Sequence, residues 1–218
     1  MLAGCPRVVP LVPMPLAAAN RDSAVVWARA TEPSAHMAIR FRWKYQDDQN
    51  RWGGRGQVRI APPDSLRFDY VGVLGIGGPG AAAIVADSTI WADPEKNFRS
   101  LVPAVRMLWA GLGIVRPPKT DAQVFRGGSP DSAFQIWRFV QDQDTLDYRE
   151  TRRSPRLLEA EWRQQGKVLA RSRTELDARG LPASARIDFP EGRARFELTV
   201  VSSDTTAIFD PAIWRGRR

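Results

Sequence analysis

Few residues in this chain have side chains that could carry out chemistry. There is one cysteine, Cys5, and one histidine, His36, which excludes an internal disulfide and a zinc site with several such ligands. A hydrolase would need a nucleophile near His36, but no Gly-x-Ser-x-Gly elbow occurs, which favours a structural or surface histidine. Asp142, Asp144 and Asp147 lack the glycine and final glutamate of a calcium loop, which favours a hairpin turn. We therefore expect no metal, no cofactor and no enzyme activity.

The one cysteine lies in a short motif at the start of the chain. Residues 2–5, Leu-Ala-Gly-Cys, resemble the lipobox of bacterial lipoproteins, where a signal peptide is removed before the cysteine. The resemblance implies that Cys5 becomes the acylated first residue and a lipid anchor. Residues 6–15 contain four prolines, which prevent regular structure and favour an extended tether. We expect residues 1–15 to be a lipobox remnant and tether; the alternative is a chance match in a disordered terminus.

A glycine-rich segment matches a nucleotide-binding pattern only superficially. Residues 75–80 fit Gly-x-Gly-x-x-Gly after a predicted strand, but dinucleotide binding requires a helix to follow. Pro79 and the short distance to Trp91 leave no room for a crossover helix. We expect instead a hairpin loop with Leu74 and Ile76 at its tip.

The chain is strongly basic. It has 32 lysines and arginines against 24 acidic residues, for a net charge of +8. Such a surplus could attract nucleic acid, anionic lipid headgroups or acidic proteins. The arginines are spread along the chain and alternate with apolar residues, and no recognition helix or stacking motif accompanies them. We therefore expect them to form the solvated face of strands, and we expect no nucleic-acid partner.

Two helices are predicted. The first covers residues 16–30, where Asp22 or Ser23 can act as a cap. The second covers residues 98–112, the most apolar stretch, whose hydrophobic residues fit a helix buried on a broad face. Pro103 lies near the expected first turn of this helix, where proline is tolerated.

Most of the remaining chain follows the period of two that is typical of strands. In residues 38–45, Ile39, Phe41 and Trp43 alternate with basic residues, as in a strand with one buried face. Turn residues separate the later segments into hairpins, and no β-helix-β alternation indicates a parallel sheet. The sequence therefore predicts a mainly β, antiparallel fold. The other predicted strands cover residues 55–60, 65–71, 81–87, 89–91, 134–140, 145–149, 156–162, 168–174, 183–189 and 194–200.

The order of these elements resembles the LolA/LolB superfamily of periplasmic lipoprotein carriers and outer-membrane lipoprotein receptors. The best local match runs from residues 63–69 through 73–75, followed by Trp91 and the helix to Gly113. The similarity in order covers residues 16–214. It implies an open antiparallel half-barrel of about 10–11 strands with helices covering its concave face.

The resemblance also assigns roles to particular residues. Residues 16–218 would form a single half-barrel domain whose apolar cavity accepts acyl chains. Receptor members carry an apolar loop that meets the membrane, and Leu74 and Ile76 occupy that place here. Eight tryptophans suit a wide cavity, although an ordinary core would account for about half of them. The candidate cavity-lining residues are Phe41, Trp43, Phe68, Leu101, Val105, Leu108, Trp109 and Trp137.

These observations predict a function based on binding. We expect a monomeric envelope lipoprotein, anchored to the outer membrane through Cys5 and facing the periplasm, that binds lipid or lipoprotein acyl chains and receives lipoproteins there. Each buried CH₂ group contributes about 0.8 kcal/mol, so a few chains would bind without any catalytic group. The alternative is a structural or assembly lipoprotein that docks a protein partner on its sheet.

Overall fold

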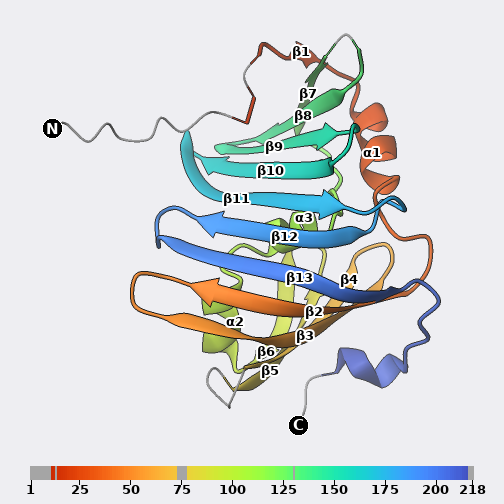
Figure 1. The fold of residues 1–218 in the computed structure, drawn as a ribbon. Helices are drawn as coiled ribbons and strands as arrows, with labels where there is room; N and C mark the ends of the chain where they lie inside the picture. Colours follow the sequence, from red (N-terminus) through yellow and green to blue (C-terminus); the bar gives the residue numbers. More distant parts are fainter. Residues whose placement is uncertain (1–10, 13, 73–77, 130, 216–218) are drawn as a thin grey trace, which may run out of the picture.

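One long sheet curls around two short helices (Figure 1). The structure is a computed structural model, and it describes residues 11–12, 14–72, 78–129 and 131–215. The strands are β1 (Ala17–Ala18), β2 (Met37–Gln46), β3 (Arg51–Ala61), β4 (Ser65–Gly72), β5 (Pro79–Val85), β6 (Ser88–Asp93), β7 (Gln123–Gly128), β8 (Phe134–Gln141), β9 (Asp144–Thr151), β10 (Arg156–Gln164), β11 (Lys167–Leu176), β12 (Pro182–Phe189) and β13 (Ala194–Asp204). The helices are α1 (Arg21–Arg29), α2 (Glu95–Leu101), α3 (Val105–Gly111) and the 3₁₀ helix η2 (Pro211–Trp214).

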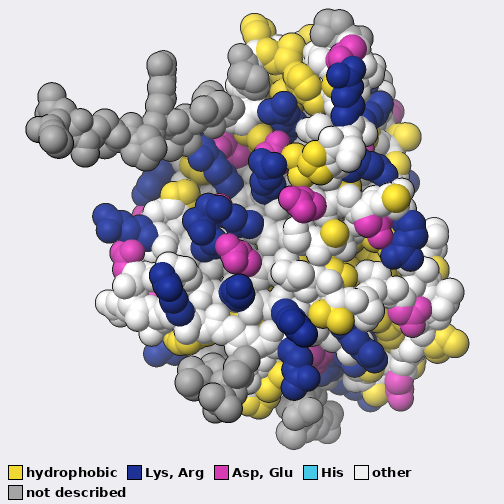
Figure 2. All heavy atoms as spheres, viewed as in Figure 1, with side chains coloured by type: hydrophobic (Ala, Val, Ile, Leu, Met, Phe, Trp, Pro, Cys, Tyr) yellow, Lys and Arg dark blue, Asp and Glu magenta, His cyan; other side chains and the backbone are white. Residues whose placement is uncertain are grey.

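The strands form an open antiparallel half-barrel. Their order is β1-β7-β8-β9-β10-β11-β12-β13-β2-β3-β4-β5-β6, and every neighbouring pair is antiparallel. The edge strands β1 and β6 do not pair with each other, so the barrel stays open. We call the face covered by α2 and α3 the inner face and the opposite face, which is toward the viewer in Figures 1 and 2, the outer face.

The alternation predicted from the sequence sorts side chains between these two faces. In β2, Phe41 and Trp43 are buried on the inner face, whereas Arg40, Arg42 and Lys44 are exposed on the outer face. The predicted mainly β half-barrel is confirmed. The outer face is consequently rich in charge, as Figure 2 shows, while the inner faces of the strands supply a single hydrophobic core.

Two of the thirteen strands were not predicted. β1 contains only Ala17 and Ala18, which pair with Arg126 and Phe125 of β7. β7 has one buried residue, Val124, and ends in two glycines, so its alternation is too short to mark a strand. The described residues therefore form 13 strands instead of the predicted 10–11, and the predicted hairpins of residues 134–200 are all present.

The first helix is shorter than predicted. It starts at Arg21 because Asn20 is its N-cap, with the Asn20 side chain accepting a hydrogen bond from the Asp22 backbone N–H at 2.6 Å. The prediction of a helix from residue 16, capped by Asp22 or Ser23, was wrong because the preceding residues pair with β7 instead. α1 packs against β7 at one end of the half-barrel.

The single helix predicted over residues 98–112 is two helices. α2 and α3 have seven residues each, and Pro103 lies in the break between them. Proline has no N–H and its ring clashes with the carbonyl four residues earlier, so Pro103 interrupts the helix instead of opening it. Gly113, with a positive φ of 78°, follows the end of α3. Within the described residues, we find no helix with the length and apolarity needed to cross a membrane.

Candidate functional site

The hollow of the half-barrel brings the predicted cavity residues together. Seven of the eight are buried members of one hydrophobic cluster: Phe41, Trp43, Phe68, Leu101, Leu108, Trp109 and Trp137. The eighth, Val105, is half-buried and packs against that cluster. In this structure the side chains of α2 and α3 fill the hollow, so these residues form a packed core. Their role in lining a cavity for ligand stays a prediction.

Aromatic rings and glycines shape the floor of the hollow on β2, β3 and β4. The rings of Phe41 and Phe68 lie 5.5 Å apart, and Phe98 of α2 packs 6.0 Å from Phe68. A Cβ atom at Gly56 would come within 2.5 Å of the Phe41 ring, and one at Gly54 within 2.9 Å of Trp43. The missing side chains of β3 therefore leave the space that these large rings occupy.

Two hydrogen bonds attach α3 to the strands around it. The Thr174 hydroxyl of β11 donates to the carbonyl oxygen of Ala110 at 2.8 Å, in the buried interior. The Trp109 Nε1–H donates to the carbonyl oxygen of Ala86, in the turn between β5 and β6, at 2.7 Å. The Arg116 guanidinium lies 4.9 Å from the Trp109 ring centre and covers it. α3 is thus attached through a few specific contacts and otherwise by packing.

The contact between α3 and β12 is close. A Cβ atom placed on Gly111 would lie 3.1 Å from the Ile187 Cδ1 atom and 3.8 Å from the Ala185 Cβ atom. At the start of α3, Arg106 lies 3.6 Å from a carboxylate oxygen of Asp87 and 3.5 Å from one of Asp144. The helix therefore sits between the β5–β6 turn and the centre of the sheet.

A pocket that the sequence did not indicate opens beside α1, with a volume of about 370 Å³. Trp27 of α1 stacks on Trp137 with ring centres 5.5 Å apart, and its Nε1–H donates to Glu150 at 3.2 Å. The pocket combines apolar side chains with both signs of charge. Its lining includes Trp27, Glu32, Met37, Leu112, Glu150, Arg152, Arg156, Leu176, Arg179 and Leu181. Burial raises the pKa of the Glu32 carboxyl. The charges of Arg116 and Arg29 act to lower this pKa, and the charge of Asp64 acts to raise it further.

Other residues considered from the sequence lie apart from the hollow. Cys5, Leu74 and Ile76 are outside the described residues. His36 is exposed and its ring stacks on Phe209 at 5.0 Å, while in the described segments no three Cys, His, Asp or Glu side chains gather as metal ligands would. The glycine-rich segment connects β4 and β5, whose antiparallel pairing confirms the predicted hairpin.

Solved structures share this arrangement at low sequence identity. A LolA superfamily protein from Nitrosomonas europaea has a TM-score of 0.59 at 12% identity, covering 89% of this chain and 97% of its own. A domain described as an outer membrane lipoprotein-sorting protein, from Vibrio parahaemolyticus, has 0.57 at 8% identity over 89% and 97%. A DUF1329 family protein from Desulfovibrio piger has 0.53 at 9% over 89% and 95%. The chain has a LolA/LolB-like fold. No protein-family model and no curated protein matches its sequence.

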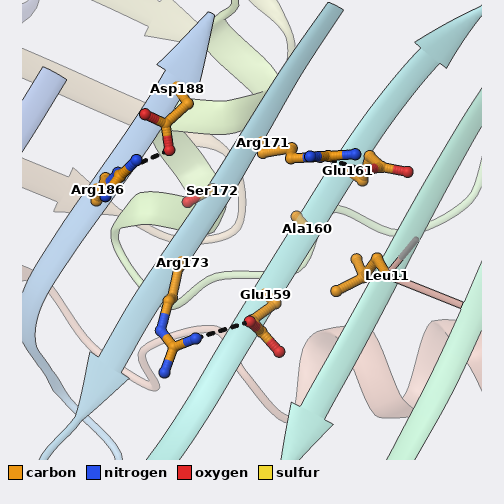
Figure 3. Close-up of a pocket in the computed structure, with 9 residues that line it drawn as sticks. All are labelled: Leu11, Glu159, Ala160, Glu161, Arg171, Ser172, Arg173, Arg186 and Asp188. Atoms are coloured by element: carbon orange, nitrogen blue, oxygen red, sulfur yellow. Dashed lines mark hydrogen bonds and ion pairs between the residues drawn. The ribbon is translucent and has the colours of Figure 1, made fainter. Parts of the chain in front are cut away.

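The outer face of the LolA/LolB-like half-barrel has a pocket of about 220 Å³ over β10, β11 and β12 (Figure 3). Leu11 lies at one side of it, beside β10. The charged side chains that line this pocket already have partners of opposite sign. These pairs are Arg171–Glu161, Arg173–Glu159 and Arg186–Asp188. The pocket therefore has no unmatched charge for a ligand, and the hollow under α2 and α3 is the better candidate site.

Proposed function

We propose that this protein is an envelope lipoprotein that binds the acyl chains of lipids or lipoproteins in the hollow of its sheet. Cys5 would anchor it to the outer membrane facing the periplasm, where it would accept lipoproteins. The observation that carries the proposal is the cover of the inner face, which consists of α2 and α3, two seven-residue helices joined by a break at Pro103. The function requires binding only, with no bond made or broken.

The packing of the hollow suggests how acyl chains would enter. If α3 moved away from β10, β11 and β12, it would uncover the apolar side chain of Trp109 and the apolar side chains on the inner face of the sheet. Each CH₂ group of an acyl chain buried in place of these contacts would contribute about 0.8 kcal/mol to the binding free energy. The chains of one lipid would therefore offset the packing energy lost when a short helix moves away. α3 is therefore the element whose movement controls access.

A disulfide across the α3–β12 contact tests this proposal. The 3.8 Å between a Cβ atom at Gly111 and the Ala185 Cβ atom matches the usual Cβ–Cβ separation of a disulfide. The variant Gly111→Cys/Ala185→Cys would be made together with Cys5→Ser, so that the chain contains only the two engineered cysteines. Uptake of a pyrene-labelled phospholipid would be measured with the disulfide formed and after its reduction.

We expect the oxidised variant to lose uptake and the reduced variant to regain it, because the disulfide holds α3 on the sheet. Gly111→Cys and Ala185→Cys alone are the matched controls, since neither can form the crosslink and both should take up lipid in either redox condition. Equal uptake by the oxidised and reduced double variant would show that α3 does not control access. Absence of uptake by every form, including the wild type, would overturn acyl-chain binding itself.

A further inference from the structure

A shallow groove of about 480 Å³ crosses the outer face where β13, β2, β3 and β4 lie side by side. Its basic residues are Arg40 and Arg42 of β2 and Arg55 of β3, all exposed. Two apolar side chains, Val71 and Val201, are 43% and 63% exposed within it. We call these five residues the arginine groove. It lies on the opposite side of the sheet from the hollow.

The strand register places like charges against each other in this groove. Arg42 lies directly opposite Arg55 in the β2–β3 ladder. Like charges directly opposite on one face of a sheet are destabilising unless something between them is negative. In the described part of the chain, the guanidinium groups of Arg40, Arg42 and Arg55 form no ion pair, since none has a carboxylate oxygen within 4.0 Å.

The acids nearest the groove are engaged elsewhere. Asp69, which also lines it, pairs with Arg59 at 2.7 Å and with Arg67 at 2.8 Å. Asp204 accepts hydrogen bonds from the Thr206 backbone N–H and hydroxyl, both at 2.9 Å. The Thr206 hydrogen bonds lower the pKa of that carboxyl, and Arg40 also lies close enough to Asp204 to help lower it, although the two form no ion pair. Arg42 and Arg55 are therefore the groove arginines left available to an external anion.

The same face contains a second pair of opposed arginines that is neutralised. Arg173 of β11 lies directly opposite Arg186 of β12. Arg173 pairs with Glu159 at 3.3 Å, and Arg186 pairs with Asp188 at 2.7 Å. The fold thus supplies acids where it places two arginines together on β11 and β12, but not on β2 and β3. This contrast sets the arginine groove apart from a generally basic surface.

The chemistry of the groove fits one class of partner. We propose that the arginine groove binds the anionic headgroups of a phospholipid membrane surface. Arginine binds phosphate oxygens in a bidentate manner, and the exposed Val71 and Val201 beside the arginines suit the apolar boundary below the headgroups. Figure 2 shows lysine and arginine side chains gathered over this part of the outer face. The proposal deepens the proposed envelope function, on which it rests for the presence of a membrane.

The test compares two double variants with the same loss of charge. The reference protein, Cys5→Ser, and both double variants made in the same background lack a lipid anchor. Each would be sedimented with phosphatidylcholine vesicles with and without phosphatidylglycerol. We expect binding that requires phosphatidylglycerol and weakens with salt. Arg42→Gln/Arg55→Gln should reduce it about 25-fold, a factor of about five for each arginine removed. Arg173→Gln/Arg186→Gln, the matched control, should bind within about twofold of the Cys5→Ser reference because its arginines are already paired.

Three results would overturn the proposal. One is equal loss in both double variants, which would mean that net charge alone attracts the vesicles. Another is binding that does not depend on phosphatidylglycerol, and the third is a groove that binds soluble polyglutamate but no vesicle, which would indicate an acidic protein. Pyrene-lipid uptake from phosphatidylcholine vesicles, which carry no anionic headgroup for the groove to bind, should be unchanged in Arg42→Gln/Arg55→Gln. Failure of the groove and failure of the acyl-chain hollow therefore give different results. Circular dichroism of each variant confirms folding, which relief of the Arg42–Arg55 repulsion should favour.

Discussion

Thr174 of β11 holds α3 on the sheet through a buried 2.8 Å hydrogen bond from its hydroxyl to the carbonyl oxygen of Ala110. Thr174→Val keeps the shape of the side chain and removes this bond, while Gly113 N–H still donates to the same oxygen. We expect a loss of about 1 kcal/mol in the free energy of unfolding, measured in urea. If α3 controls access to the hollow, the variant should also take up pyrene-labelled phospholipid faster than wild type.

Ser172, two residues earlier on the same strand, provides the matched control. Its hydroxyl oxygen is buried and has no hydrogen-bond partner among the described residues. Ser172→Ala should therefore leave stability unchanged or raise it slightly, and should leave the rate of lipid uptake as it is. Equal stability and equal uptake in Thr174→Val and Ser172→Ala would show that the Thr174 bond does not secure the helix.

Gly56→Ala should be strongly destabilising. The added methyl group would lie 2.5 Å from the Phe41 ring and 2.8 Å from the backbone carbonyl oxygen of Asp69, and the backbone cannot easily move. We expect a loss of about 3 kcal/mol by chemical denaturation, with partial recovery when Phe41→Leu removes the ring. Gly192→Ala, where the nearest atom would be 3.9 Å away, is the control and should change stability by less than about 0.5 kcal/mol. Similar losses at both glycines would contradict the close packing described for β3.

Glu32→Gln should change how stability depends on pH. Burial raises the pKa of the Glu32 carboxyl in the folded state, so between the unfolded and folded pKa values the folded protein binds more protons than the unfolded protein. Stability from this group is thus complete below the unfolded pKa and is lost as pH rises through the folded pKa. The neutral amide avoids that loss, so the variant should be slightly more stable than wild type at neutral pH and lose this advantage in acid. Thermal unfolding across the acidic range measures the difference, and a constant difference at all pH values would contradict it.

The strands could be predicted because their alternation is local. Phe41 and Trp43 alternate with basic residues within one segment, so the sequence alone separates the inner and outer faces of β2. The short strand at Ala17–Ala18 could not be predicted, because its formation depends on pairing with β7, more than a hundred residues later. The apolar pattern continues across Pro103, so the pattern predicts one helix with Pro103 near its first turn and does not indicate the break that the structure has there.

The sequence predicts which residues lie in the candidate site, but not whether they line an open cavity or pack against each other. Trp109 and Trp137 were expected near a cavity, and the structure places both in the cluster that fills the hollow. Whether such residues face empty space or each other depends on how closely α3 packs, which no spacing in the sequence reveals. The opposed pair Arg42 and Arg55 was equally hidden, because which residues lie opposite is set by strand register and not by either strand alone.

The position of β2 beside β13 has a consequence for the time course of folding. Strands β2 to β6 and strands β7 to β13 are two consecutive meanders, and the β13–β2 ladder is where they join. The β2 edge stays unpaired until β13 is available, because Phe41 pairs with Val200, some 160 residues further along the chain. During synthesis, the amino-terminal meander must therefore persist with β2 as a free edge. The charged side chains of Arg40, Arg42 and Lys44 along it would discourage pairing with a neighbouring chain until the last hairpin arrives.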